Sequence, residues 1–131
     1  MSENLVTGWK VPSEERDRLL AVFPARFPDI VADHVTLRAG TNSNTPLPAK
    51  VSGLIVGAID NAAGVQALIV EVAGETSRSD GGTYHITWSL DRAAGRTAKE
   101  SNEVIARRGW QRLPQTIAVR LEPARWPRSG Q

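Results

Sequence analysis

Two tetrapeptides of this chain share one pattern: a histidine, a β-branched apolar residue, a threonine and a large apolar residue. They are residues 34–37 (His-Val-Thr-Leu) and 85–88 (His-Ile-Thr-Trp), and they hold the only two histidines of the sequence. Polar residues that alternate with β-branched and apolar ones at a period of two predict β-strands. Because residues i and i+2 of a strand point the same way, each histidine shares a face with its threonine, and the apolar residues point toward a core.

The two histidines can act together if the fold brings their strands together. One imidazole can then take a proton from water, and the other can protonate the oxygen that leaves a phosphate ester. Thr36 and Thr87 would donate hydrogen bonds to the non-bridging phosphate oxygens. A single histidine on a strand is usually a hydrogen-bonded structural residue, and that alternative stays open for each. The repetition of the whole motif favours an active site.

Paired His-x-Thr-apolar motifs on strands resemble the signature of the 2H phosphoesterase superfamily, whose members act on 2′,3′-cyclic phosphates or 2′–5′ bonds. The sequence is most similar to the small branch that includes the cyclic phosphodiesterase domain of fungal tRNA ligases and the Swiss-army-knife RNA-repair-like proteins. In that branch a Ser-Asn pair follows the second motif, and residues 99–102 (Lys-Glu-Ser-Asn) hold the corresponding place. The resemblance covers residues 30–105 and is specific at the motifs.

The resemblance implies pseudo-symmetric antiparallel sheets around a central groove, with few helices on the outside. It also implies a metal-independent phosphodiesterase without a cofactor, acting on an RNA end or a small nucleotide. The expected catalytic residues are His34, His85, Thr36 and Thr87. The expected substrate-binding residues are Arg38, Lys99, Ser101 and Asn102. Arg38 is included because the period of two puts it on the face of His34, and Ser101 has the alternative role of a helix N-cap.

The pattern along the chain predicts one α+β domain over residues 1–131, because strands outnumber helices and hairpin signals favour antiparallel pairing. Helices are expected at 13–27 and 102–108. Strands are expected at 31–38, 49–59, 65–73, 84–90 and 116–121. Loops are expected at 39–48 and 74–82, and the tail after residue 124 is expected to fray.

Basic residues are concentrated in the second half of the sequence. Residues 1–65 hold six Lys/Arg and seven Asp/Glu, whereas residues 66–131 hold ten and seven. Within 92–128 there are nine basic residues, eight of them Arg, and three acidic ones. Arg suits phosphate oxygens, so this segment is either a polyanion-binding face or an Arg-rich solvated surface.

Other features limit the function classes. The chain has no cysteine, which excludes disulfides and thiolate metal sites. A two-histidine metal site is disfavoured for want of neighbouring ligands, since Asp33 is expected on the opposite strand face from His34. No signal peptide or membrane span is evident, and we expect a cytoplasmic protein. Trp9 and Trp110 are the candidates for stacking on a base, and Tyr84 is expected in the core. The competing function is a non-catalytic RNA- or nucleotide-binding module of the same fold.

Overall fold

The computed structural model describes residues 4–128. All strand pairings in this part are antiparallel, and they form one seven-stranded sheet with the order β2-β6-β5-β4-β7-β1-β3. The strands are β1 (Leu5–Lys10), β2 (Asp29–Ile30), β3 (His34–Thr41), β4 (Val51–Asp60), β5 (Val65–Glu71), β6 (His85–Leu90) and β7 (Gln111–Pro127). The helices are α1 (Ser13–Val22), α2 (Glu100–Arg108) and the short 3-10 helix η1 (Arg92–Ala94). The expected α+β class is confirmed.

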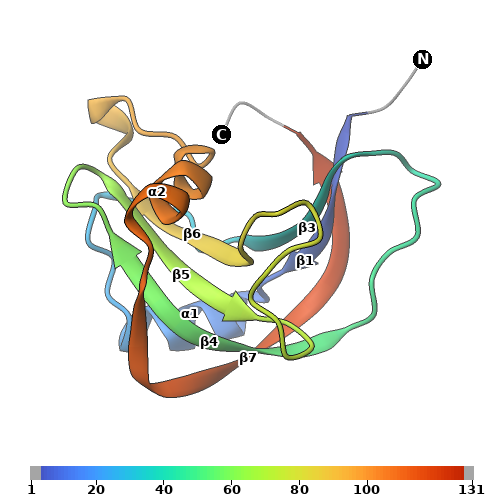
Figure 1. Cartoon of the computed structure of the whole chain (residues 1–131), viewed down its shortest axis with the longest axis horizontal. Coiled ribbons are helices and arrows are strands. Elements are labelled where there is room, and N and C mark those ends of the chain that lie inside the picture. Colours follow the sequence, from blue (N-terminus) through green and yellow to red (C-terminus); the bar gives the residue numbers. More distant parts are fainter. Residues whose placement is uncertain (1–3, 129–131) are drawn as a thin grey trace.

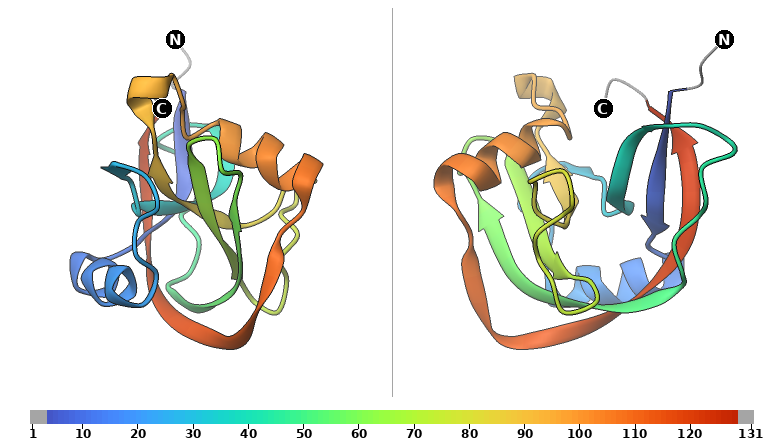
Figure 2. Two further views of the ribbon diagram at one scale, coloured as in Figure 1. Left: turned by 90° about the vertical axis from the view of Figure 1, so that its left-hand side faces the viewer. Right: turned by 45° about the vertical axis from the view of Figure 1, so that its right-hand side comes forward.

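The sheet is strongly curved, and β7 is the strand that joins its two parts (Figure 1). The first part of β7 pairs with β4, and residues 122–127 pair with β1. Figure 2 shows the sheet turning through a U, so that β3 and β6, which belong to opposite ends of the strand order, come to face each other. The sequence-based expectation of two pseudo-symmetric sheets is not confirmed, since one continuous sheet contains all seven strands.

The main core lies on the face of the sheet that α1 covers. Leu19 of α1 and Val35, Ile86 and Trp88 of the two motifs are fully buried in it. The indole N–H of Trp88 donates to the carbonyl oxygen of Phe23 at 2.8 Å, which holds the end of α1 against β6. The expectation that the apolar residues of both motifs face the core is therefore confirmed, as is the burial of Tyr84.

The opposite face of the sheet carries a smaller apolar cluster under α2. Ala67 and Ile69 of β5 pack there with Val56 and with Ile105 of α2. In the antiparallel register, Ala67 is paired with Thr87 and Ile69 with His85. Because directly paired residues share a face, His85 and Thr87 lie on the α2 side of the sheet.

Two backbone hydrogen bonds tie the segment before β3 to β6. The amides of Val31 and Ala32 donate to the carbonyl oxygens of Trp88 and Thr87 at 2.9 and 3.0 Å. Ala32 has a φ of 43°, in the left-handed region, which redirects the chain between β2 and β3. The strand expected over 31–38 is thus displaced, with β2 ending at residue 30 and β3 beginning at residue 34.

Two further expectations are wrong, and one strand was not predicted. The helix expected to reach residue 27 ends at Val22, since Pro24 cannot donate a helical hydrogen bond. Residues 5–10 were not expected to form a strand, yet β1 pairs on both sides. Residues 125–127 do not fray, because they pair with β1, whereas residues 129–131 of the expected frayed tail lie outside the described residues. The expected hairpin of 49–59 with 65–73 is confirmed by β4 and β5.

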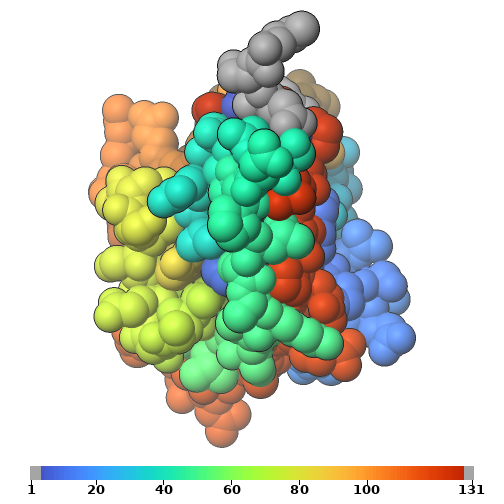
Figure 3. All heavy atoms as spheres, turned by 90° about the vertical axis from the view of Figure 1, so that its right-hand side faces the viewer, coloured from blue at the N-terminus to red at the C-terminus, as the bar shows by residue number. Residues whose placement is uncertain are grey.

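The loop after β3 covers part of the outside of the sheet. In Figure 3 the segment around residues 42–50 (green) lies between the loop near residue 75 (yellow-green) and β7 (red). The indole of Trp9 donates to the carbonyl oxygen of Ala49 at 2.8 Å, and the Arg125 guanidinium donates to that of Thr45. This loop is consequently fastened to both β1 and β7.

Candidate functional site

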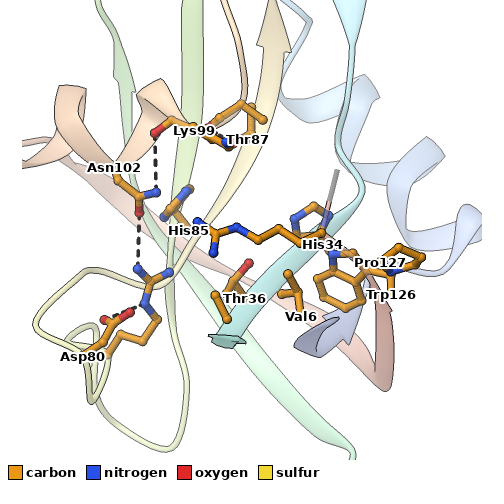
Figure 4. A pocket seen from close by; sticks show the side chains of 14 residues that line it. Val6, His34, Thr36, Asp80, His85, Thr87, Lys99, Asn102, Trp126 and Pro127 are labelled. Carbon is orange, nitrogen blue, oxygen red and sulfur yellow. Dashed lines mark hydrogen bonds and ion pairs between the residues drawn. The ribbon is translucent and has the colours of Figure 1, made fainter. Parts of the chain in front are cut away.

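Both His-x-Thr motifs line one cavity, between β3, β6 and the beginning of α2. His34 and Thr36 lie on the β3 side of this cavity, and His85 lies across from His34 on β6 (Figure 4). The complete lining consists of Val6, His34, Thr36, Ala39, Arg78, Asp80, His85, Thr87, Ala98, Lys99, Asn102, Trp126, Pro127 and Arg128. The fold thus brings together all four residues expected to be catalytic.

The strands that carry the motifs are not neighbours in the sheet. Strand β3 is one edge of the strand order, and β6 is second from the other edge. The curvature of the sheet brings the two strands together instead. The cavity is therefore lined by residues of β3 and β6, the strands that face each other across the U of the sheet (Figure 2).

His85 is the more deeply buried of the two histidines, with 8% of its surface exposed. Its Nδ1 lies 2.8 Å from the carbonyl oxygen of Thr83. A carbonyl oxygen can only accept, so Nδ1 carries the hydrogen and the neutral ring presents Nε2 as an acceptor. The pKa of His85 is lowered to about 4, mainly by burial and in part by the positive charge of Arg78. The hydrogen bond to Thr83 acts in the opposite direction.

His34 has a different environment, in which a carboxylate lies beside the ring. Its Nδ1 is 3.0 Å from Oδ2 of Asp33, and the same oxygen forms an ion pair with the Lys10 ammonium group. The hydrogen bond from His34 is the largest influence that holds the pKa of Asp33 well below its usual range, and Lys10 acts in the same direction. Asp33 is therefore an anion at neutral pH. Its side chain does not point away from that of His34, as strand alternation suggested, because β3 begins only at His34.

Trp126 is a site residue that the sequence analysis missed. Its ring centre lies 4.5 Å from that of His34, and the Lys10 ammonium lies 4.9 Å from the Trp126 ring centre. Such a position of an ammonium group over an indole is a cation–π interaction. The tryptophan holds the His34 ring from one side while Asp33 holds it at Nδ1. Trp126 lies in the segment that was expected to fray, so the sequence pattern gave no signal for it.

Thr87 is positioned by a buried serine. The two hydroxyl oxygens of Thr87 and Ser101 are 2.8 Å apart, and Ser101 is fully buried. Ser101 is not a helix cap, because α2 begins at Glu100 with Lys99 at the N-cap position. Ser101 also does not line the cavity, so it would influence a substrate only by positioning the Thr87 hydroxyl.

Lys99 and Asn102 line the cavity at the beginning of α2, as expected for substrate-binding residues. Asn102 is further linked to an arginine that was not expected at the site. The Arg78 guanidinium donates to Oδ1 of Asn102 at 3.3 Å and to Oδ1 of Asp80 at 2.8 Å (Figure 4). The Arg78 side chain is only 9% exposed, so the loop 74–82 presents a fixed cation to the cavity.

Arg38 is not brought to the cavity with the other expected residues. It is exposed on β3, and the next residue of the same strand, Ala39, lines the cavity instead. Arg128 at the end of the described chain lines the cavity as well. The positive charge at the site therefore comes from Arg78, Lys99 and Arg128. A signal for Arg78 was present in the sequence, as an arginine in a Gly-rich loop shortly before the second motif.

The two tryptophans proposed for base stacking have different positions. Trp9 is 3% exposed, donates its N–H to a backbone oxygen and packs edge-on against Tyr84, so it belongs to the core. Trp110 is half-buried and lines a second cavity next to the first. The prediction that Trp9 stacks on a base is therefore not supported, and that for Trp110 stays open.

Among residues 4–128, no group of three or more His, Asp and Glu side chains could hold a metal ion. In the same part of the chain, no helix has the length and apolar character needed to cross a membrane. The chain matches no protein-family model, no curated protein and no solved structure. The resemblance to 2H phosphoesterases accordingly rests on the motifs and stays a prediction.

The low pKa of His85 predicts a specific dependence of stability on pH. The ring binds a proton near pH 6.5 in the unfolded chain but only near pH 4 in the folded one, so stability is fully present above pH 6.5 and falls between pH 6.5 and 4. The loss attributable to His85 amounts to roughly 3 kcal/mol at most. It is measured by urea unfolding at several pH values in the wild type and in His85→Asn, in which an amide can still donate to Thr83. Parallel curves for the two proteins would show that His85 is not held neutral.

Proposed function

We propose that this protein is a metal-independent phosphodiesterase that opens a 2′,3′-cyclic phosphate at an RNA end or on a small nucleotide. The observation that carries the proposal is the presence of both histidines and both motif threonines around one cavity, with basic residues in its wall. In the reaction, a water oxygen forms a bond to phosphorus and one ester P–O bond breaks. One imidazole accepts the proton of the water, and the other gives a proton to the departing sugar oxygen.

His85 has the properties of the general base. A base must be unprotonated before the reaction, and burial keeps His85 neutral with a pKa of about 4. The hydrogen bond from Nδ1 to Thr83 leaves Nε2 as the free acceptor of a proton. The developing phosphate negative charge and the movement of a proton onto His85 would occur together, so the buried positive charge is not formed alone.

His34 has the properties of the general acid. Asp33 accepts the Nδ1 hydrogen and fixes the tautomer and orientation of the ring, as carboxylates do for catalytic histidines. Its negative charge lies directly beside the ring. Lys10 and Trp126 keep this pair in place. The different surroundings of the two rings thus support opposite roles.

The remaining residues of the cavity would bind the phosphate oxygens. Thr36 lies on the β3 side, and Thr87 can accept a hydrogen bond from Ser101 while donating its own hydrogen to the substrate. Lys99 and Arg78 add positive charge on the α2 side. Preorganised donors of this kind stabilise the charge that grows in the transition state. A groove between two arms of an antiparallel sheet also agrees with the 2H-like architecture, which we propose as the finer description of the fold.

The first test is hydrolysis of 2′,3′-cyclic mononucleotides in the presence of EDTA. The wild type is expected to remain active, and His34→Ala or His85→Ala to lose activity by about a hundredfold or more, the usual scale of general acid–base catalysis. The double variant should lose much less than the product of the two effects, because the residues act as a unit. Thr36→Ala is expected to lose less than either histidine variant, since proton transfer is left intact.

Equal rates for wild type and His85→Ala, with both proteins folded by circular dichroism, would overturn the enzymatic proposal. Retained binding of nucleotide phosphates in that case would favour the binding-module alternative.

The assignment of acid and base predicts the effect of Asp33→Asn on the pH profile of kcat/KM. The acid limb should lie near pH 4, where His85 becomes protonated, and should be the same in both proteins. Between the two limbs, kcat/KM should fall in Asp33→Asn, because an amide fixes the tautomer and orientation of the His34 ring less firmly than the carboxylate does. A shift of the acid limb instead would reverse the two roles.

Arg78 and Arg38 form a matched pair for testing the phosphate-binding wall. Arg78→Gln removes a charge that lines the cavity, and we expect a rise in KM of about tenfold or more, because a hydrogen bond to a charged group contributes roughly 1.5–3 kcal/mol. Arg38→Gln removes an exposed charge from β3 and should change KM less than twofold. Steady-state kinetics at fixed ionic strength measures both. A larger rise in KM for Arg38→Gln than for Arg78→Gln would instead assign phosphate binding to Arg38, as strand alternation suggested.

A further inference from the structure

A second cavity adjoins the first one, and the two share a wall. Arg78, Asp80 and Asn102 line both cavities. The second cavity continues from this wall along α2, past Ile105 and Ala106, to Trp110. Its volume of about 480 Å³ lies within the range of small-molecule sites, roughly 300–1,000 Å³. A ligand bound at the histidines can therefore extend into this space without leaving the protein surface.

Trp110 provides a rigid aromatic group in this second cavity. Its ring packs against the backbone at Gly57, where a Cβ atom would clash with it, and against the apolar cluster under α2. The Arg112 guanidinium lies 5.1 Å from the centre of the same ring. An indole and a guanidinium together can stack on a nucleobase and attract its phosphate.

The charged side chains in the lining of the second cavity are the ion-paired Arg78 and Asp80, and further arginines lie on α2 and β7 nearby. Residues 104–121 contain four arginines and no acidic residue. Two of these, Arg107 and Arg108, lie in the last turn of α2, and Arg112 lies on β7. Glu103 pairs with Arg107, whereas Arg112 contacts the ring of Trp110. Arg107 and Arg108 line a different cavity, so the cations at the second cavity are Arg78 in its wall and Arg112 at the ring of Trp110.

We propose that the cavity beside Trp110 binds the penultimate nucleoside of an RNA chain, the one before the nucleoside that carries the cyclic phosphate. The substrate is then the end of an RNA chain rather than a free mononucleotide. This inference rests on the proposed phosphodiesterase function. Arg78 and Asn102 in the shared wall would hold the phosphate that connects the last two nucleosides, and Trp110 would contact the base of the penultimate one. A mononucleotide lacks the second nucleoside that would contact Trp110.

The experiment compares a 2′,3′-cyclic mononucleotide with a dinucleotide that ends in the same cyclic phosphate. The wild type should show a kcat/KM for the dinucleotide at least about fivefold higher, the lower end of what stacking on an aromatic side chain contributes. Ala106→Glu fills the second cavity and adds a negative charge there, while Ala106 is exposed and glutamate is a good helix former. This variant should lose the dinucleotide preference and keep the mononucleotide rate.

Ala21→Glu is the matched control, since Ala21 is also exposed on a helix but lies on α1, away from both cavities. It should behave as the wild type on both substrates. Trp110→Phe, which keeps an aromatic ring on Gly57, should retain part of the preference, and Arg112→Gln should reduce it. A wild type without preference, or an Ala106→Glu variant that keeps the full preference, would overturn the inference.

A failure of the proposed function can be told apart from a failure of this inference. If no cyclic phosphate is hydrolysed, fluorescence anisotropy with a 5′-fluorescein dinucleotide carrying a 3′-phosphate tests the cavity directly. Binding that is at least about fivefold weaker in Ala106→Glu than in Ala21→Glu would support the second cavity as a nucleoside site without turnover. Equal binding by the two variants, or none by the wild type, would overturn it.

Discussion

Two backbone hydrogen bonds, from Val31 and Ala32 to the carbonyl oxygens of Trp88 and Thr87, close the U of the sheet. They join the residues just before the first motif to the residues of the second one. Each buried amide needs a partner, so once β6 has formed, its free edge specifies where the segment before β3 must lie. His34 follows Ala32 by two positions, and the place of its ring relative to β6 depends on these bonds. The cavity exists because the two arms of the sheet are fixed at this point.

The two imidazoles occupy environments that separate their chemistry. His85 is enclosed by the sheet and α2 and donates to a neutral carbonyl oxygen, and burial keeps its pKa low. His34 donates to a carboxylate that is held ionised by Lys10. Two identical side chains in identical sequence motifs thus differ in the charge of the group next to Nδ1 and in their burial. That difference supports the proposed division into a base and an acid.

The cations around the site come from three separate parts of the chain. Arg78 is fixed by Asp80 and Asn102, Lys99 precedes α2, and Arg128 follows β7. Holding an arginine between an aspartate and an asparagine limits its conformational freedom before any anion binds, which lowers the entropic cost of binding. The same fixed arginine forms the wall between the two cavities, and this is why the proposed nucleoside site and the proposed reaction site depend on each other.

The sequence by itself determined which residues of each motif face the core and which face the site. A period of two leaves no other choice once one face of a strand is buried, so Val35, Ile86 and Trp88 were placed correctly together with His34 and His85. It also determined the β4–β5 hairpin, because a short turn-forming segment separates two apolar runs. These are local properties, and they follow from neighbouring residues alone.

Only the tertiary structure decided the residues that join the motifs to the rest of the site. Trp126 reaches His34 because the last residues of β7 pair with β1, a contact between the two ends of the chain that no local pattern specifies. Asp33 reaches His34 because β3 starts at residue 34, three residues later than the strand expected from residue 31. Arg38 does not reach the cavity because the pairing of β3 with β1 shifts between Thr36 and Arg38, which interrupts the period of two, and Ala39 lines the cavity instead. Arg78 reaches the cavity from the loop 74–82, whose place the alternation of β3 does not determine. Strand pairing and sheet curvature are long-range, and they determined which cations meet the two histidines.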